Sequence, residues 1–155
     1  MSFSEKLYQN FIEDDRWLLL VNGLKVTILV TLFALLVGVI IGFTVAIIRS
    51  LHDKTGKFKI LNAICKVYLT IWRGTPTMVQ LLIMSMVIFN NSRNFTMVGA
   101  LALGINSGAY VSEIIRGGLM AVDPGQMEAG RSLGLNYMTT MVVIIIPQAI
   151  RAVLP

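Results

Sequence analysis

The sequence predicts an all-α protein, namely a polytopic bundle of helices that cross a membrane. Composition is the first reason: 55% of the 155 residues are hydrophobic and only 14% are charged, whereas a soluble domain carries about 25% charged residues. The mean hydropathy of +0.76 agrees with this. The apolar residues also form blocks long enough to cross a bilayer. The net charge of +5 therefore indicates orientation in a membrane rather than binding of nucleic acid.

Residues 18–48 form the first expected membrane span. Its second part carries no charged residue over a length that crosses a bilayer with some tilt. Gly38 and Gly42 are four residues apart, so they lie on one face of the helix. A pair of small residues at this spacing lets a second helix approach closely.

Two charged segments flank this span and predict its orientation. Residues 1–17 are mainly acidic and are expected to form a short amphipathic helix at the membrane surface. Residues 49–66 hold five Lys or Arg residues against one Asp and are expected to be a loop. By the positive-inside rule this loop is cytoplasmic, which predicts a multi-pass protein with its N-terminus outside.

The second expected span, residues 67–90, is interrupted at residues 73–76. Pro76 removes a helical hydrogen bond, and Gly74 weakens the helix further. A broken helix at membrane depth is tolerated only where it is packed in protein or lines a cavity, and its free backbone groups can hold a charged solute. Arg73 beside the break is a candidate for a solute path. The alternative is that its side chain reaches the cytoplasmic surface.

Residues 95–116 form the third expected span. Ala100, Gly104 and Gly108 recur at every fourth position and predict one smooth face for close helix packing. Glu113 and Arg116 are three residues apart, so they share a face and can form an ion pair. Two interpretations of this pair remain: a structural ion pair, which its position near the end of the span favours, or part of a solute path.

Residues 123–135 predict a short polar helix with signals at both ends. Asp123 is a good N-cap, and Pro124 falls at the first helical position. Gln126 is placed to complete a capping box. Gly134 is suited to end the helix in a left-handed conformation. Because so short a helix is marginal by itself, it is either a docking element for a partner protein or a plain connector at the membrane surface.

Residues 138–155 begin a fourth expected span. Asn136 is suited to cap it, and Pro147 predicts a kink. The sequence stops within this apolar run. We therefore expect residues 1–155 to be a single transmembrane domain that is truncated at its C-terminus.

Three motifs follow one another through the second half of the sequence. They are Trp72-Arg73-Gly74-Thr75-Pro76; then Ala109-Tyr110, Glu113-Ile114 and Arg116-Gly117-Gly118; and then Gly125-Gln126-Met127-Glu128-Ala129-Gly130 with Leu133-Gly134, Pro147-Gln148-Ala149 and Leu154-Pro155.

In this order and spacing the motifs resemble the permease subunits of bacterial ATP-binding-cassette (ABC) importers, in the branch that takes up polar amino acids such as glutamine, histidine and arginine. The resemblance implies the type I transmembrane fold of ABC importers, with about five helices, of which this chain would hold about four. It also implies a bacterial cell membrane, a second permease chain in a homo- or heterodimer, cytoplasmic ATPase subunits and an external solute-binding protein.

The resemblance also assigns roles to residues. The short helix would be the coupling helix that docks into the ATPase, although Gly130 stands where the family's Glu-Ala-Ala motif has its second alanine. The residues expected to couple to the ATPase are Gly125, Gln126, Glu128, Ala129, Gly130, Leu133 and Gly134. The residues expected along the substrate path are Arg73, Gly74, Thr75, Pro76, Glu113 and Arg116.

Other classes of protein fit the sequence less well. A secondary amino-acid carrier or channel-like subunit without an ATPase would not need the docking helix and would want more intramembrane acids than Glu113. A membrane anchor gains nothing from Arg73 or Glu113. The sequence holds no phosphate-binding glycine loop, metal-ligand cluster or nucleophile–base pair. We therefore expect no enzyme activity, catalytic residue, metal or cofactor in this chain, and ATP hydrolysis by the partner.

Overall fold

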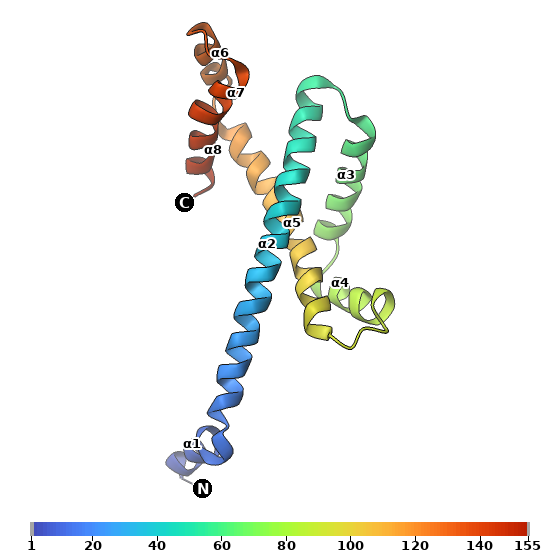
Figure 1. The fold of residues 1–155 in the computed structure, drawn as a ribbon, viewed down its shortest axis with the longest axis vertical. Coiled ribbons are helices and arrows are strands. Elements are labelled where there is room, and N and C mark those ends of the chain that lie inside the picture. Colours follow the sequence, from blue (N-terminus) through green and yellow to red (C-terminus); the bar gives the residue numbers. More distant parts are fainter. Residues whose placement is uncertain (1, 155) are drawn as a thin grey trace.

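The computed structural model describes residues 2–154, with the side chains of residues 3, 6 and 7 left out. Throughout this range the regular structure is helical, which confirms the predicted all-α class. Figure 1 shows the helices as an elongated arrangement with the two termini far apart. The elements in chain order are α1 (Phe3–Phe11), η1 (Glu13–Asp15), α2 (Trp17–Thr55), α3 (Lys59–Gly74), α4 (Thr77–Ile83), η2 (Met84–Ile88), α5 (Phe95–Ala121), α6 (Pro124–Ser132), α7 (Tyr137–Thr140), η3 (Met141–Ile145) and α8 (Ile146–Val153).

The crossing of α2 and α5 forms the centre of the fold (Figure 1). Both predicted small-residue faces lie in this contact, which confirms them. A Cβ atom on Gly38 would lie 2.8 Å from Ser107 Oγ, and one on Gly104 would lie 2.9 Å from Val37 Cβ. The two backbones approach closely because no side chain stands between them at these glycines.

The predicted loop over residues 49–66 is wrong, because most of this segment is helical. Helix α2 continues to Thr55 and α3 begins at Lys59, so only three residues connect them. His52 and Lys54 lie in the last turn of α2, where positive charge is favourable for the helix dipole. Gly56 then ends the helix with φ of 66°. The basic residues thus mark the end of a helical hairpin.

The predicted break in the second span is confirmed. Helix α3 ends at Gly74, and α4 begins at Thr77 and continues into η2, a π-helix of five residues. The two parts meet at an angle of 108°. Thr75 is extended, with ψ of 147°, as expected for a residue that precedes proline. Figure 1 shows α4 turned across the lower end of α5.

Helix α5 runs further than expected, through Gly117 and Gly118 to Ala121. These glycines do not loosen the helix, because Gly118 packs against the last helix. A Cβ atom on Gly118 would lie 2.9 Å from the carbonyl oxygen of Ala149. In the C-terminal part, the π-helix η3 directly precedes α8 and its Pro147.

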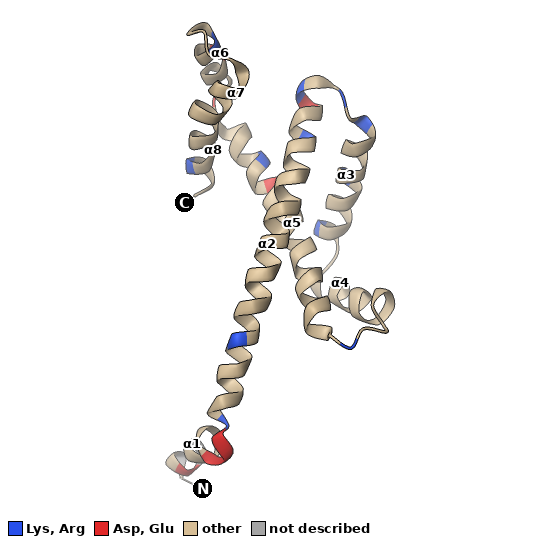
Figure 2. Cartoon of the chain, viewed as in Figure 1, with Lys and Arg blue, Asp and Glu red and all other residues tan. Residues whose placement is uncertain are grey.

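Two helices are long and apolar enough to cross a membrane, and the bent α3–α4 pair makes a third if it counts as one span. Residues 137–153 form a shorter apolar helix. Figure 2 shows the charged residues gathered at the acidic end near α1, at the α2–α3 turn and around the upper part of α5. The N-terminal end and the basic turn therefore lie at opposite ends of α2.

Candidate functional site

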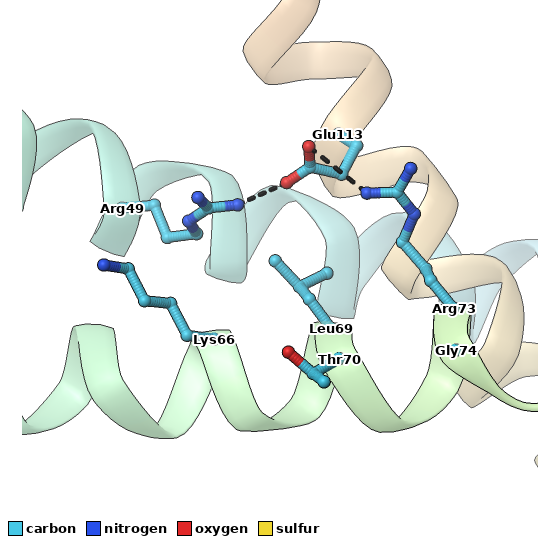
Figure 3. A pocket seen from close by; sticks show the side chains of 7 residues that line it. All are labelled: Arg49, Lys66, Leu69, Thr70, Arg73, Gly74 and Glu113. Atoms are coloured by element: carbon cyan, nitrogen blue, oxygen red, sulfur yellow. Dashed lines mark hydrogen bonds and ion pairs between the residues drawn. The ribbon is translucent and has the colours of Figure 1, made fainter.

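Three helices bring charged side chains together around Glu113 on α5 (Figure 3). Glu113 Oε1 accepts a hydrogen bond from Arg49 Nη1, near the basic end of α2. Glu113 Oε2 lies 3.4 Å from Arg73 Nη1, at the end of α3. Arg73 also lies over the ring of Tyr110, with its guanidinium carbon 5.8 Å from the ring centre. The side chain of Arg73 is 44% exposed and pairs with Glu113, so the structure places it in this cluster.

Arg116 extends the cluster toward the α2–α3 turn. Its Nη1 donates a hydrogen bond of 3.0 Å to Asp53 Oδ2, while its Nε lies 3.9 Å from Glu113 Oε1. The predicted pairing of Glu113 with Arg116 is therefore present but long. The closer partners of Glu113 come from other helices, so the carboxylate joins α2, α3 and α5.

A cavity of about 500 Å³ lies beside Glu113. Figure 3 shows the side chains that line it, which come from α2, α3 and α5. They are Arg49, Lys66, Leu69, Thr70, Arg73, Gly74 and Glu113. The lining thus includes three of the residues expected along the substrate path, Arg73, Gly74 and Glu113.

The break between α3 and α4 is stabilised by Gln80, which is only 6% exposed. Its Nε2 donates to the carbonyl oxygens of Trp72, at 2.9 Å, and Thr75, at 3.0 Å. Its Oε1 accepts a hydrogen bond of 2.7 Å from Asn106 Nδ2 on α5. Because Pro76 and the bend leave helical carbonyls without their usual partners, Gln80 replaces the missing amide donors and ties the break to α5.

The short helix α6 has the ends that the sequence predicts. Asp123 Oδ1 accepts from the Gly125 amide at 2.8 Å. At the other end, the Gly134 amide donates to the Arg131 carbonyl at 3.0 Å, and Gly134 has φ of 82°. The capping box predicted for Gln126 is not formed, because its side-chain oxygen accepts a hydrogen bond from Gln148 on α8 instead.

One face of α6 is buried and the other is open. Gly130 is buried, and a Cβ atom there would lie 2.5 Å from Thr140 Cγ2 on α7. Glu128 and Ala129 are exposed, as is Leu133 at 80%. Gly130 therefore holds α6 against the C-terminal helices, whereas these three side chains remain available to a partner.

Residues 38–155 match the protein family described as "Binding-protein-dependent transport system inner membrane component". This match covers more than half of the sequence. The chain belongs to this family.

The chain is similar to several named bacterial permeases. Putative glutamine transport system permease protein GlnP of Rickettsia prowazekii is 38% identical over 141 residues, which cover 89% of this chain and 62% of that protein. Arginine transport system permease protein ArgU of Corynebacterium glutamicum is 31% identical, covering 96% of this chain and 49% of that protein. L-cystine transport system permease protein TcyB of Bacillus subtilis is 32% identical, covering 94% and 61%.

The fold is similar to that of a solved amino acid ABC transporter, described as "Crystal structure of an amino acid ABC transporter with histidines". The TM-score is 0.69 and the identity 38%, with 89% of this chain and 66% of that chain covered. The predicted class, a type I transmembrane domain of an ABC transporter, is confirmed. The chain spans 62% of the length of GlnP from Rickettsia prowazekii.

Arg49, Gln80 and Asn106 take part in these contacts, although their sequence positions do not predict it. The basic segment around Arg49 predicts a loop, whereas Arg49 lies on a helix with its side chain 15% exposed. The sequence signal for this helix is that residues 18–55 contain no helix breaker other than single glycines. Gln80 and Asn106 are single amides in apolar segments. Such a residue indicates a hydrogen-bond partner elsewhere in the fold, because buried amides are nearly always hydrogen-bonded.

Proposed function

We propose that this chain is the permease subunit of an ATP-driven importer for polar amino acids. In this proposal it forms part of the translocation path and couples to a cytoplasmic ATPase through residues 123–135. The observation that carries the proposal is α6: a short helix capped at both ends, held on its inner face by Gly130, with Glu128 and Leu133 exposed on the outside.

The position of α6 supports a cytoplasmic partner. In Figure 1, α6 and the α2–α3 turn lie toward the same end of the molecule. Segment 49–66, which contains the turn, holds the basic residues that predict a cytoplasmic location. An exposed helix at that end can be reached by an ATPase, and the N-terminus would then lie outside.

The contacts of α6 support a mechanical link to the candidate solute path. Helix α6 follows α5 after only two residues, and α5 carries Glu113. At the basic end of α2, Lys54 Nζ donates a hydrogen bond of 2.6 Å to Tyr137 Oη on α7, and Asp53 binds Arg116 on α5. A displacement of α6 by an ATPase would therefore act on α5, α7 and α2 together. Partner-driven motion of this kind alters the path through the rearrangement of packed helices.

The broken second span supports a solute path in this part of the protein. Its bend brings Arg73 and Gly74 to the cavity beside Glu113. Ionisable residues within membrane segments are costly and generally mark pathways for solutes or ions. The relatives named for glutamine, arginine and cystine transport support an amino acid as the solute.

Purification of the intact protein from its native membrane tests this function. We expect a tagged chain, solubilised in mild detergent, to bring with it an ABC ATPase in equimolar amount, as measured by quantitative mass spectrometry. The variant Leu133→Asp places a charge on the exposed face of α6 and should lose the ATPase. Phe58→Asp, in the turn between α2 and α3 at 53% exposure, serves as the matched control if both variants insert.

Two results would contradict the proposal. One is recovery of the chain from mild detergent without any ATPase, which would favour a carrier driven by another source of energy. The other is an ATPase that stays bound to the Leu133→Asp variant as strongly as to the wild type, which would exclude the outer face of α6 as the docking surface.

A further inference from the structure

The cavity beside Glu113 has more positive than negative charge. Its lining includes Arg49, Lys66 and Arg73 but only one carboxylate, that of Glu113. Both oxygens of that carboxylate already have arginine partners. Among the described residues, Lys66 takes part in no ion pair or hydrogen bond. The cavity therefore has positive charge that no group of the described chain neutralises.

The Lys66 ammonium has hydrogen-bond donors to spare. Lys66 is exposed, and none of its three N–H groups has an acceptor within the described part of the chain. Arg49 Nε also lacks an acceptor there, but this atom is buried and is closed to the cavity. Figure 3 shows the Lys66 ammonium on the Arg49 side of the cavity, away from the Glu113 carboxylate. The Lys66 ammonium and the Arg49 guanidinium thus lie on one side of the cavity, where they would neutralise an anionic oxygen.

The size and the mixed charge of the cavity indicate which anion it would take. A volume of about 500 Å³ lies within the range of small-molecule sites, which is about 300–1,000 Å³. A phosphate group carries no cation that could meet the Glu113 carboxylate in the same lining. A zwitterion, in contrast, matches both signs of charge, because its carboxylate meets the cations and its ammonium meets Glu113.

We propose that this cavity is a binding site for the zwitterionic head group of the transported amino acid. Lys66 and Arg49 bind its carboxylate, and Glu113 faces its ammonium group. Arg73 is the residue that adjusts, because it is the more exposed partner of Glu113 and its ion pair is open to solvent. This inference rests on the proposed function. It assigns roles to Arg49 and Lys66, which lie outside all three sequence motifs.

Chemical labelling of Lys66 in the intact transporter tests the site. Lys66 is exposed and reacts with an amine-directed acetylating reagent, and so does Lys59, an exposed lysine on the same helix that does not line the cavity. We expect L-glutamine or L-arginine to slow the labelling of Lys66 about tenfold relative to Lys59, as measured by mass spectrometry. The corresponding amino acid amides retain the ammonium but lack the carboxylate, and should leave the ratio unchanged.

A pair of variants gives an independent measurement. Lys66→Gln should reduce uptake of labelled amino acid at low concentration about tenfold, as expected for the loss of one charge-assisted hydrogen bond, whereas Lys59→Gln should match the wild type. The transporter is reconstituted in vesicles with its ATPase and binding protein for this comparison.

The outcomes separate the two proposals. If the wild type takes up no amino acid, the proposed function fails and the site fails with it. If the wild type transports but neither the labelling nor Lys66→Gln distinguishes Lys66 from Lys59, the site alone is overturned. Equal protection by amino acids and their amides also overturns it. If a second permease chain protects Lys66 without any added solute, the acceptor for Lys66 is a group of the protein. This result also overturns the site.

Discussion

Glu113 Oε2 on α5 lies 3.4 Å from Arg73 Nη1 at the end of α3, so one ion pair joins the third span to the break in the second. The same carboxylate binds Arg49 on α2. One side chain thus joins three helices, so removal of its charge should weaken the contacts among all three.

Glu113→Gln should lower the thermal stability of the purified protein. The change leaves the guanidinium groups of Arg49 and Arg73 without their carboxylate, which we expect to cost about 1–3 kcal/mol. Thermal unfolding in detergent, followed by tryptophan fluorescence, measures the effect. Glu128→Gln is the control, since Glu128 is exposed and takes part in no ion pair of the described residues. Equal midpoints for the two variants would contradict a joining role for Glu113.

The addition of a single methyl group at the contact of α2 with α5 should lower the stability of the protein. Gly104→Ala places a Cβ atom 2.9 Å from Val37 Cβ, whereas Gly99→Ala, on the same helix, meets nothing within 4 Å. We expect the first change to lower stability by about 1–3 kcal/mol through overpacking. The second should be neutral or slightly stabilising, because alanine favours helix by about 0.5–1 kcal/mol over glycine. The difference between their unfolding midpoints tests the close crossing.

Gln80→Leu should destabilise the break. Leucine has a similar size but cannot donate to the carbonyls of Trp72 and Thr75. It also removes the nearer of the two acceptors of Asn106 Nδ2, which leaves only the Trp72 carbonyl at 3.4 Å. We expect a loss of about 1–3 kcal/mol. A double-mutant cycle with Asn106→Leu isolates the pair, because the second change should cost less once the first is present. Strict additivity would show that the two amides act independently.

Gly130→Ala should loosen α6 from α7. The added methyl group would lie 2.5 Å from Thr140 Cγ2, so the helix must move or Thr140 must turn. Thr140→Ser removes this methyl group and retains the hydroxyl, so the double variant should recover the stability and ATPase binding that Gly130→Ala loses. A failure of Thr140→Ser to rescue would place the clash elsewhere.

Glu128→Ala should reduce solute-stimulated ATP hydrolysis without affecting membrane insertion. Its side chain lies on the open face of α6 and contributes no ion pair within the described part of the protein, so we expect its loss to act on the partner contact. Hydrolysis in reconstituted vesicles, compared with Glu13→Ala at the opposite end of the molecule, provides the measurement. Normal coupling in Glu128→Ala would remove this residue from the docking surface.

The features that the sequence predicts correctly depend on residues close together in the chain. Asp123 and Gly134 determine the ends of α6 through backbone groups that are two and three residues away, respectively. Pro76 breaks the second span by its own covalent structure. Gly104 and Gly108 mark a helix contact because a regular stripe of small residues has few other uses.

The features that were missed depend on residues far apart in the chain. The partners of Glu113 are 64 residues away at Arg49 and 40 positions away at Arg73, by sequence number. Gln126 has a suitable local partner but binds Gln148 instead. The positive charge of segment 49–66 indicates the membrane surface and so predicts a loop. Lysine and arginine are also good helix formers, however, and most of the segment is helical.

The hydrogen bonds of Gln80 have a consequence for the source of energy. In ion-coupled carriers, carbonyl oxygens freed by a broken helix bind the driving Na⁺. Here the carbonyls of Trp72 and Thr75 receive the Gln80 amide, and a donor group directed at the same position repels a cation. The break thus holds a bend without offering a coordination site for sodium. A sodium ion at this bend would have to displace the Gln80 amide before it could bind either carbonyl.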